Sequence, residues 1–151
     1  MRRFHTPFLG LPYEVWQAGP VAKDVFIDLS ETPVLLDGYV RKQIVGDATY
    51  IQASREFNDD EFSDNDILVM QEVLKKYGNK TARELVQLTH QKGSLWYKIA
   101  SENKLLDKFE KKLMNNSDFL IDFGDELTET GKDFYNDQID FLQTSRAYSR
   151  Y

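Results

Sequence analysis

Two histidines, His5 and His90, and a large set of carboxylates are the residues of this chain that could perform metal or acid–base chemistry. Neither histidine lies in the HExxH spacing of zinc hydrolases, and no Asp or Glu stands three or four positions from His90. A metal-dependent hydrolase that uses His90 would need carboxylates from distant segments, and we keep it as an alternative. A structural role is favoured, because an imidazole near a helix C-terminus interacts well with the helix dipole.

Other catalytic patterns are missing from the sequence. There is no cysteine, which removes thiolate nucleophiles and thiolate metal sites and fits a reducing compartment. The glycines form no GxGxxG, Walker or GxSxG pattern, and no serine has a base at a recognisable spacing. We therefore expect a protein that is not an enzyme and that needs no metal and no cofactor.

The charge of the chain favours a protein partner over nucleic acid. The net charge is −6 and the sequence pI is about 4.9, whereas nucleic-acid binding needs a positive field. No apolar run reaches the ~20 residues of a membrane span, so we expect a cytoplasmic protein with no membrane partner. Residues 115–141 hold eight acidic residues against Lys132 alone. This acidic region is either a solvated face or a surface that steers a basic partner, with the candidates Asp118, Asp122, Asp125, Glu126, Asp133 and Asp137.

The first half of the chain predicts a small sheet and two helices. Alternation in YEVWQA predicts a strand within residues 12–18, and Gly19-Pro20 then predicts the start of a helix over 21–29. Residues 38–55 predict a hairpin that turns at Gly46-Asp47. Ser63 is an N-cap for the next helix, which would bury the stripe Ile67, Met70, Val73, Leu74 and Tyr77.

The second half predicts helices. Thr81-Ala82-Arg83-Glu84 is a full capping box, and the helix that follows it should bury Leu85 and Leu88. Further helices are expected after Ser94, over 103–114 and over 132–148, while FLIDFG would be a short strand or turn. Together the elements predict one mostly helical α+β domain over 1–151, with a small antiparallel sheet from residues 12–18 and 38–55.

The two tryptophans of the chain are the largest side chains that could anchor this fold. Trp16 and Trp96 can each anchor a core or a binding hot spot, and the core is the favoured interpretation for both.

The order of these pieces resembles a known family. PYEVWQAGPV, a Ser-capped helix that ends in KKYG, and TARELVQLTHQKGSLW follow one another as they do in the Panacea domain of SocA-like antitoxins and phage-associated proteins. The resemblance covers roughly residues 5–100. The matching positions are Trp16, Gly19, Pro20, Val21, Tyr77, Gly78, Ala82, Glu84, Leu85, Leu88, Thr89, His90 and Trp96.

The resemblance implies a bacterial antitoxin of a toxin–antitoxin system, which neutralises a cognate protein toxin by direct binding. It also implies that a protease could be recruited through the chain as an adaptor. The alternative is a phage-encoded accessory protein that binds a host factor. The expected interface is the acidic region together with the rim near Trp16 and His90, and a basic toxin docked there would lose affinity in added salt.

One departure from the family concerns the N-terminus. The family usually begins with an apolar helix before the segment that matches RRFHTPFLG, and Met1 stands where that helix would end. We therefore expect that this chain lacks the family's first helix, and that the apolar surface so exposed favours a homodimer.

Overall fold

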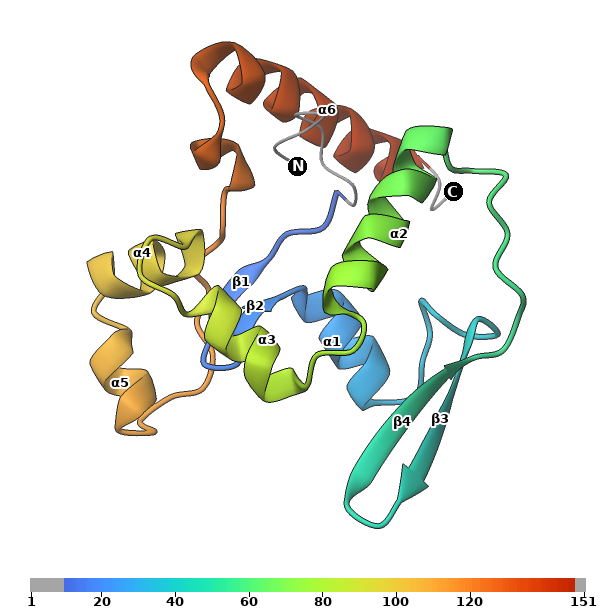
Figure 1. Ribbon diagram of the computed structural model, residues 1–151, viewed down its shortest axis with the longest axis horizontal. Helices are drawn as coiled ribbons and strands as arrows, with labels where there is room; N and C mark the ends of the chain where they lie inside the picture. Colours follow the sequence, from blue (N-terminus) through green and yellow to red (C-terminus); the bar gives the residue numbers. More distant parts are fainter. Residues whose placement is uncertain (1–9, 149–151) are drawn as a thin grey trace. The chain divides into compact units, whose positions relative to one another are not determined.

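A computed structural model describes residues 10–148, without the side chains of Ala48, Gln143 and residues 145–148. The chain divides into two compact units (Figure 1). The first unit combines the chain up to Val21 with the chain from Thr81 onward, and the second unit is Ala22–Lys80. Helices predominate and the strands are antiparallel, so the predicted mostly helical α+β class is confirmed.

The sheet of the first unit starts with a tight hairpin of two short strands. β1 (Glu14–Trp16) pairs with β2 (Gly19–Val21), with Val15 opposite Pro20 and Trp16 opposite Gly19. The prediction that Gly19-Pro20 opens a helix is wrong, because this backbone folds back onto β1 and the helix begins only at Lys23. Proline has no N–H to donate and is tolerated in β2 because β2 lies at an edge of the sheet.

A third segment runs along the other side of β1. The Val15 N–H donates to the Phe119 carbonyl at 2.9 Å, and the Ile121 N–H donates to the Tyr13 carbonyl at 2.8 Å. The Gln17 N–H donates to the Asn115 carbonyl at 2.9 Å. Residues 115–121 thus give β1 a second hydrogen-bonded neighbour from about a hundred residues away along the chain, which local sequence patterns do not reveal.

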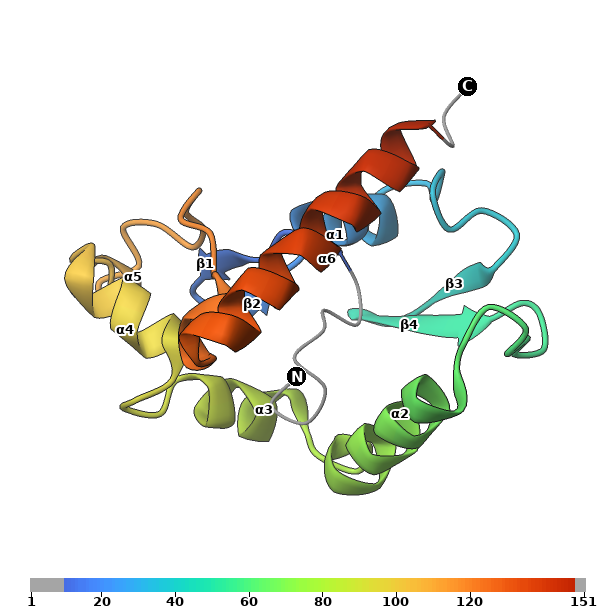
Figure 2. The same ribbon diagram turned by 90° about the horizontal axis from the view of Figure 1, so that it is seen from above.

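The helices of the first unit are α3 (Ala82–Thr89), α4 (Leu95–Glu102), α5 (Leu106–Glu110), the 3-10 helix η1 (Phe123–Glu126) and α6 (Glu129–Tyr148) (Figure 2). The capping box of α3 is confirmed, since the Glu84 carboxylate accepts the Thr81 N–H at 2.8 Å. The continuous helix predicted over 103–114 is wrong. Lys104 and Lys112 adopt φ of 55° and 53°, which interrupts a helix on both sides of α5.

The core of the first unit forms where α4 and α5 cover β1. It contains Val15, Trp96, Ala100, Leu105, Phe109 and Ile121, all at most 6% exposed. Leu85 and Leu88 of α3 were predicted to be buried, but they are 39% and 36% exposed. The predicted core role is confirmed for Trp96, which is 4% exposed, whereas Trp16 is half-buried.

The second unit contains α1 (Lys23–Ser30), α2 (Asp64–Tyr77) and a separate hairpin of β3 (Val40–Val45) with β4 (Ala48–Ala53). The predicted hairpin is confirmed, and it turns at Gly46, whose φ is +60°. It forms its own two-stranded sheet, whereas the sequence predicted one sheet shared with residues 12–18. The Ser63 cap of α2 is confirmed as a full capping box with Asp66.

The stripe predicted to be buried along α2 is not buried. None of the residues of α2, all of which the structure describes, falls in the buried class, and Val73 and Leu74 are 49% and 67% exposed. A buried carboxylate organises the loop after α1 instead. Asp28 is 7% exposed and accepts the N–H groups of Val34, Leu35 and Leu36 at 2.6, 2.8 and 3.0 Å.

Candidate partner-binding site

The first unit brings together five of the residues that carry the family resemblance. The indole N–H of Trp96 donates to the Trp16 carbonyl at 2.9 Å, which joins α4 to the end of β1. Ser94 connects the two helices that flank it, because its hydroxyl donates to the Thr89 carbonyl and accepts the Tyr97 N–H. The end of α3, the start of α4 and the β1–β2 hairpin are therefore fastened to one another.

Gly19 packs so closely against Thr89 that a larger residue at position 19 would clash with the Thr89 side chain. Gly19 has a φ of +116°, which L-residues rarely adopt, and a Cβ added there would lie 3.0 Å from Thr89 Oγ1. The Thr89 hydroxyl donates to the Val86 carbonyl at 3.0 Å, which holds it in this position. Pro20 and Val21 complete the hairpin opposite Val15 and Glu14.

His90 ends α3 and stacks on the core. Its ring lies on the indole of Trp96, with 3.6 Å between ring centroids and 17° between ring planes. Its Nε2 atom is buried and has no hydrogen-bond partner among the described residues. Burial lowers the pKa of His90, so the imidazole is neutral at physiological pH and one of its nitrogens is an acceptor.

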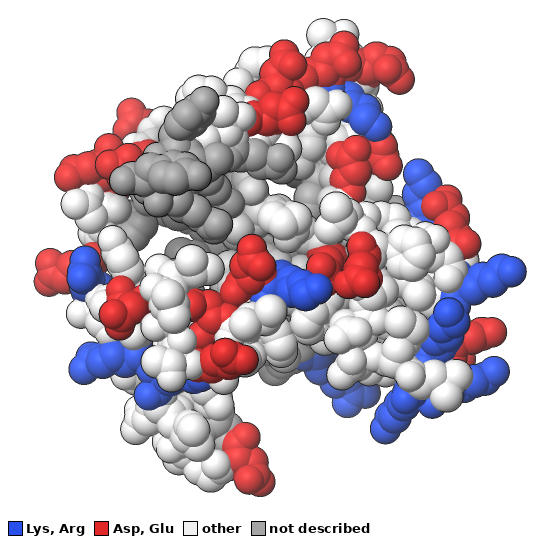
Figure 3. All heavy atoms as spheres, turned by 180° about the vertical axis from the view of Figure 1, so that it is seen from behind, with Lys and Arg blue, Asp and Glu red and all other residues white. Residues whose placement is uncertain are grey.

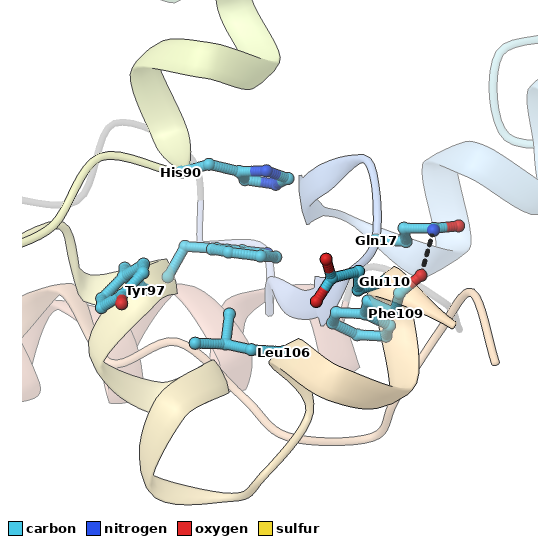
Figure 4. Close-up of a pocket in the computed structure, with 7 residues that line it drawn as sticks. Gln17, His90, Tyr97, Leu106, Phe109 and Glu110 are labelled. Carbon is cyan, nitrogen blue, oxygen red and sulfur yellow. Dashed lines mark hydrogen bonds between the residues drawn. The ribbon is translucent and has the colours of Figure 1, made fainter. Parts of the chain in front are cut away.

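A pocket of about 440 Å³ opens beside this stack (Figure 4). His90 borders it from the end of α3, Tyr97 and Trp96 from α4, and Leu106, Phe109 and Glu110 from α5. Gln17 completes the lining and donates from its amide to the Phe109 carbonyl at 2.6 Å. The Glu110 carboxylate points toward the interior of the pocket in Figure 4, so the pocket combines apolar walls with polar groups.

The described residues give the hydrolase alternative no support. No group of three or more His, Asp or Glu side chains in residues 10–148 is arranged to hold a metal ion. His90 stacks on an indole and has a pocket beside it that carries one carboxylate, Glu110. His5 lies outside the described residues.

The six acidic candidates are all exposed, and they come from three segments of the first unit. Asp118 lies in the segment beside β1, Asp122, Asp125 and Glu126 lie at η1, and Asp133 and Asp137 lie on α6. Lys132 donates to Asp125 at 2.5 Å and lies 3.7 Å from Asp122. The hydrogen bond from Lys132 lowers the pKa of Asp125. Figure 3 shows acidic side chains gathered where α6 begins, while Lys and Arg side chains gather over α4 and α5.

An apolar surface on the second unit is the feature that sequence patterns missed. Among the described side chains of this unit, the only one in the buried class is that of Asp28. The hairpin exposes Ile44, Val45 and Tyr50 by 73%, 54% and 54%, and α2 exposes Leu68 by 50%. We call these residues the apolar surface of the second unit, together with Phe26, Ile27, Val34, Leu35, Tyr39, Ile51, Phe57, Val73 and Leu74.

For α2, the spacing of the apolar residues is present in the sequence and predicts a buried face. The apolar residues of α2 have the spacing of a buried face, and the sequence does not tell whether the covering partner belongs to the same chain. Periodicity identifies a face that avoids water and does not identify what covers it.

Comparisons with known proteins gave one match. A family model described as "Antitoxin SocA-like, Panacea domain" matches residues 1–97. This range agrees with the roughly 5–100 over which the sequence resembles that family. No curated protein and no solved structure matches the chain. Among the described residues, no helix has the length and hydropathy needed to cross a bilayer.

Proposed function

Because the chain belongs to the family of SocA-like antitoxins with the Panacea domain, we propose that it neutralises a cognate protein toxin by binding to it directly. The family match over residues 1–97 carries this proposal. In this proposal the bound chain blocks the toxin's active site or target-binding site. The antitoxin itself catalyses no reaction.

The apolar surface of the second unit supports binding as the mechanism. Exposed large hydrophobics gather on its hairpin, on the loop after α1 and on α2, where Val34, Ile44 and Leu74 are 79%, 73% and 67% exposed. Large exposed apolar patches mark interaction sites in proteins. Burial of apolar side chains in an interface is favourable, and the affinity is what remains after the costs of association and ordering.

The hairpin adds a second means of binding. It consists of two strands only, so the outer edge of β3 and the outer edge of β4 have no further strand beside them among the described residues. An isolated two-stranded hairpin is marginally stable in water, and a partner that supplies a strand would stabilise it. We propose that the toxin packs on this hairpin and on α2.

The acidic region is the proposed second contact. Asp133 and Asp137 are exposed and would attract a basic toxin, whereas Asp122 and Asp125 already share Lys132. Charges at the rim of an interface mainly raise the association rate. In this proposal the acidic region steers the toxin, and added salt slows association more than it speeds dissociation.

Co-expression with the gene adjacent to the one that encodes this chain tests the proposal. We expect the neighbouring product to stop growth when it is expressed alone, and growth to return when this chain is present. We also expect the two proteins to co-purify. A neighbour that is harmless alone, or a toxic neighbour that this chain neither rescues nor binds, would contradict the proposal.

A further inference from the structure

We propose that the pocket beside His90 receives one arginine side chain of the bound protein partner. All the residues that line the pocket belong to the first unit. In naming a toxin as the partner, this inference rests on the proposed function. The pocket itself can be tested without a toxin.

The polar groups of the pocket are matched to a ligand that only donates hydrogen bonds. Neutral His90 lines the pocket and offers a lone pair on one of its two ring nitrogens. The Gln17 amide donates its N–H to the Phe109 carbonyl, so its oxygen remains an acceptor. The Glu110 carboxylate accepts only. A guanidinium has five donors and no acceptor, so it is complementary to this set.

Within the lining itself, charge also favours a cation, against the Lys and Arg side chains that gather over α4 and α5 (Figure 3). Among the described residues that line the pocket, Glu110 is the only one that carries a full charge at neutral pH. A carboxylate or phosphate ligand would be repelled by Glu110 and would find no cationic donor in the lining. A neutral apolar ligand would displace water from Gln17 and Glu110 and offer them no hydrogen bond in return, which costs free energy.

The size and walls of the pocket fit the stem of the same side chain. Its volume of about 440 Å³ is within the range of pockets that bind organic groups. Tyr97 and Leu106 provide apolar walls, against which the three methylene groups of an arginine can pack. A lysine could use the same walls, but its compact ammonium cannot reach several acceptors in one plane.

The acceptor is held rigidly, which lowers the entropic cost of binding. His90 stacks on Trp96, and Trp96 is fixed both by its burial at 4% exposure and by its bond to the Trp16 carbonyl. Phe109 stacks on Trp96 as well, with 6.1 Å between ring centroids. A preorganised polar group loses little freedom when its ligand arrives.

Titration of the purified chain with N-acetyl-arginine-N-methylamide tests the pocket. The readout is the indole N–H signal of Trp96 in an NMR spectrum. We expect a saturable shift at Trp96. We expect binding at least about tenfold weaker for the citrulline analogue, which has the same shape without the charge, because a charge-assisted hydrogen bond is lost.

Three variants locate the binding. Glu110→Gln removes the charge of an exposed residue and should weaken binding about tenfold. Glu102→Gln removes the charge of another exposed glutamate that does not line the pocket, and it should leave binding unchanged. His90→Phe keeps a flat ring on Trp96 but removes the acceptor, so it should weaken binding while the NMR spectrum of the folded chain persists.

The outcomes of these experiments distinguish a failure of the arginine pocket from a failure of the proposed antitoxin function. No saturable shift, equal binding of the citrulline analogue, or equal losses in Glu110→Gln and Glu102→Gln would each overturn the arginine pocket. If the pocket fails while the chain still rescues growth, the antitoxin proposal stands alone. If the amide binds as expected and the chain neutralises no toxin, the pocket stands and the partner has been named wrongly.

Discussion

The imidazole of His90 lies flat on the indole of Trp96, with 3.6 Å between ring centroids. This contact connects the surface of the first unit to its core, because Trp96 belongs to the buried cluster of β1, α4 and α5. It also places the His90 side chain at a pocket. The stability of the first unit and the proposed arginine pocket therefore depend on the same pair of residues.

Trp96→Ala should lower the free energy of unfolding by about 3–5 kcal/mol, because it removes a large buried ring and leaves a cavity. Urea denaturation followed by circular dichroism measures the change. Leu113→Ala is the matched control, since Leu113 is 73% exposed and its truncation should change stability by no more than about 0.5 kcal/mol. Equal losses in the two variants would contradict the assigned core.

Gly19→Ala should destabilise the chain by about 1–3 kcal/mol through backbone strain, with an added cost from the clash with Thr89. Gly93→Ala controls for the strain alone, because Gly93 has a φ of +92° and nothing within 4 Å of an added Cβ. We expect the loss in Gly19→Ala to exceed that in Gly93→Ala. The excess should shrink in a Thr89→Ala background, and an excess that persists there would rule out the steric explanation.

Stability should depend on pH through His90. Burial lowers its pKa, so the unfolded chain binds a proton near pH 6.5 while the folded chain does not. The stabilisation is complete above about pH 6.5 and is lost as the pH falls below that value. Denaturation at about pH 7.5 and about pH 5.5 should show a smaller difference in His90→Phe than in the wild type. His5 is present in both proteins and cancels in the comparison.

Asp28 should give a second, more acidic dependence in the second unit. Burial raises the pKa of Asp28, but the N–H donors of Val34, Leu35 and Leu36 and the charge of Lys42 outweigh it, so the pKa lies below its usual value. The stabilisation is present above the unfolded pKa of about 3.9 and is lost as the pH falls through the lower, folded value.

Asp28→Asn should therefore lower stability at neutral pH and flatten the acid limb of the stability curve. Asp24→Asn, an exposed aspartate on the same helix, should do neither. Thermal unfolding across the acid range is the measurement, and equal curves for the two variants would show that Asp28 does not organise the loop after α1.

Local features of the fold could be predicted from the sequence, because their causes are local. The capping boxes that begin with Ser63 and Thr81 are formed by residues three positions apart. The β3–β4 turn depends only on Gly46 and its neighbours. Features that depend on distant partners were predicted wrongly or not at all. Gly19-Pro20 has the sequence pattern of a helix start, yet it forms a strand that pairs with β1. β1 also forms hydrogen bonds with residues 115–121.

The residues of the candidate site also fall into two groups, those that the sequence identified and those that it did not. Trp16, Gly19, Thr89, His90 and Trp96 were singled out from the order of short motifs, and the structure brings them together. Gln17, Leu106, Phe109 and Glu110 were not singled out, because nothing in their local spacing relates them to His90. Val73 and Leu74 of α2 were predicted to be buried and are exposed, since exposed and buried helix faces have the same periodicity.

Calorimetric titration of the purified chain with the toxin from the co-expression experiment tests the central claim most directly. Wild-type chain should bind, Ile44→Lys should bind at least about tenfold more weakly, and Leu113→Lys should bind like the wild type. The two positions are matched, since each side chain is 73% exposed, but only Ile44 belongs to the apolar surface of the second unit. Growth rescue without measurable binding would contradict neutralisation by direct contact, and equal affinities for the two variants would contradict the assigned surface.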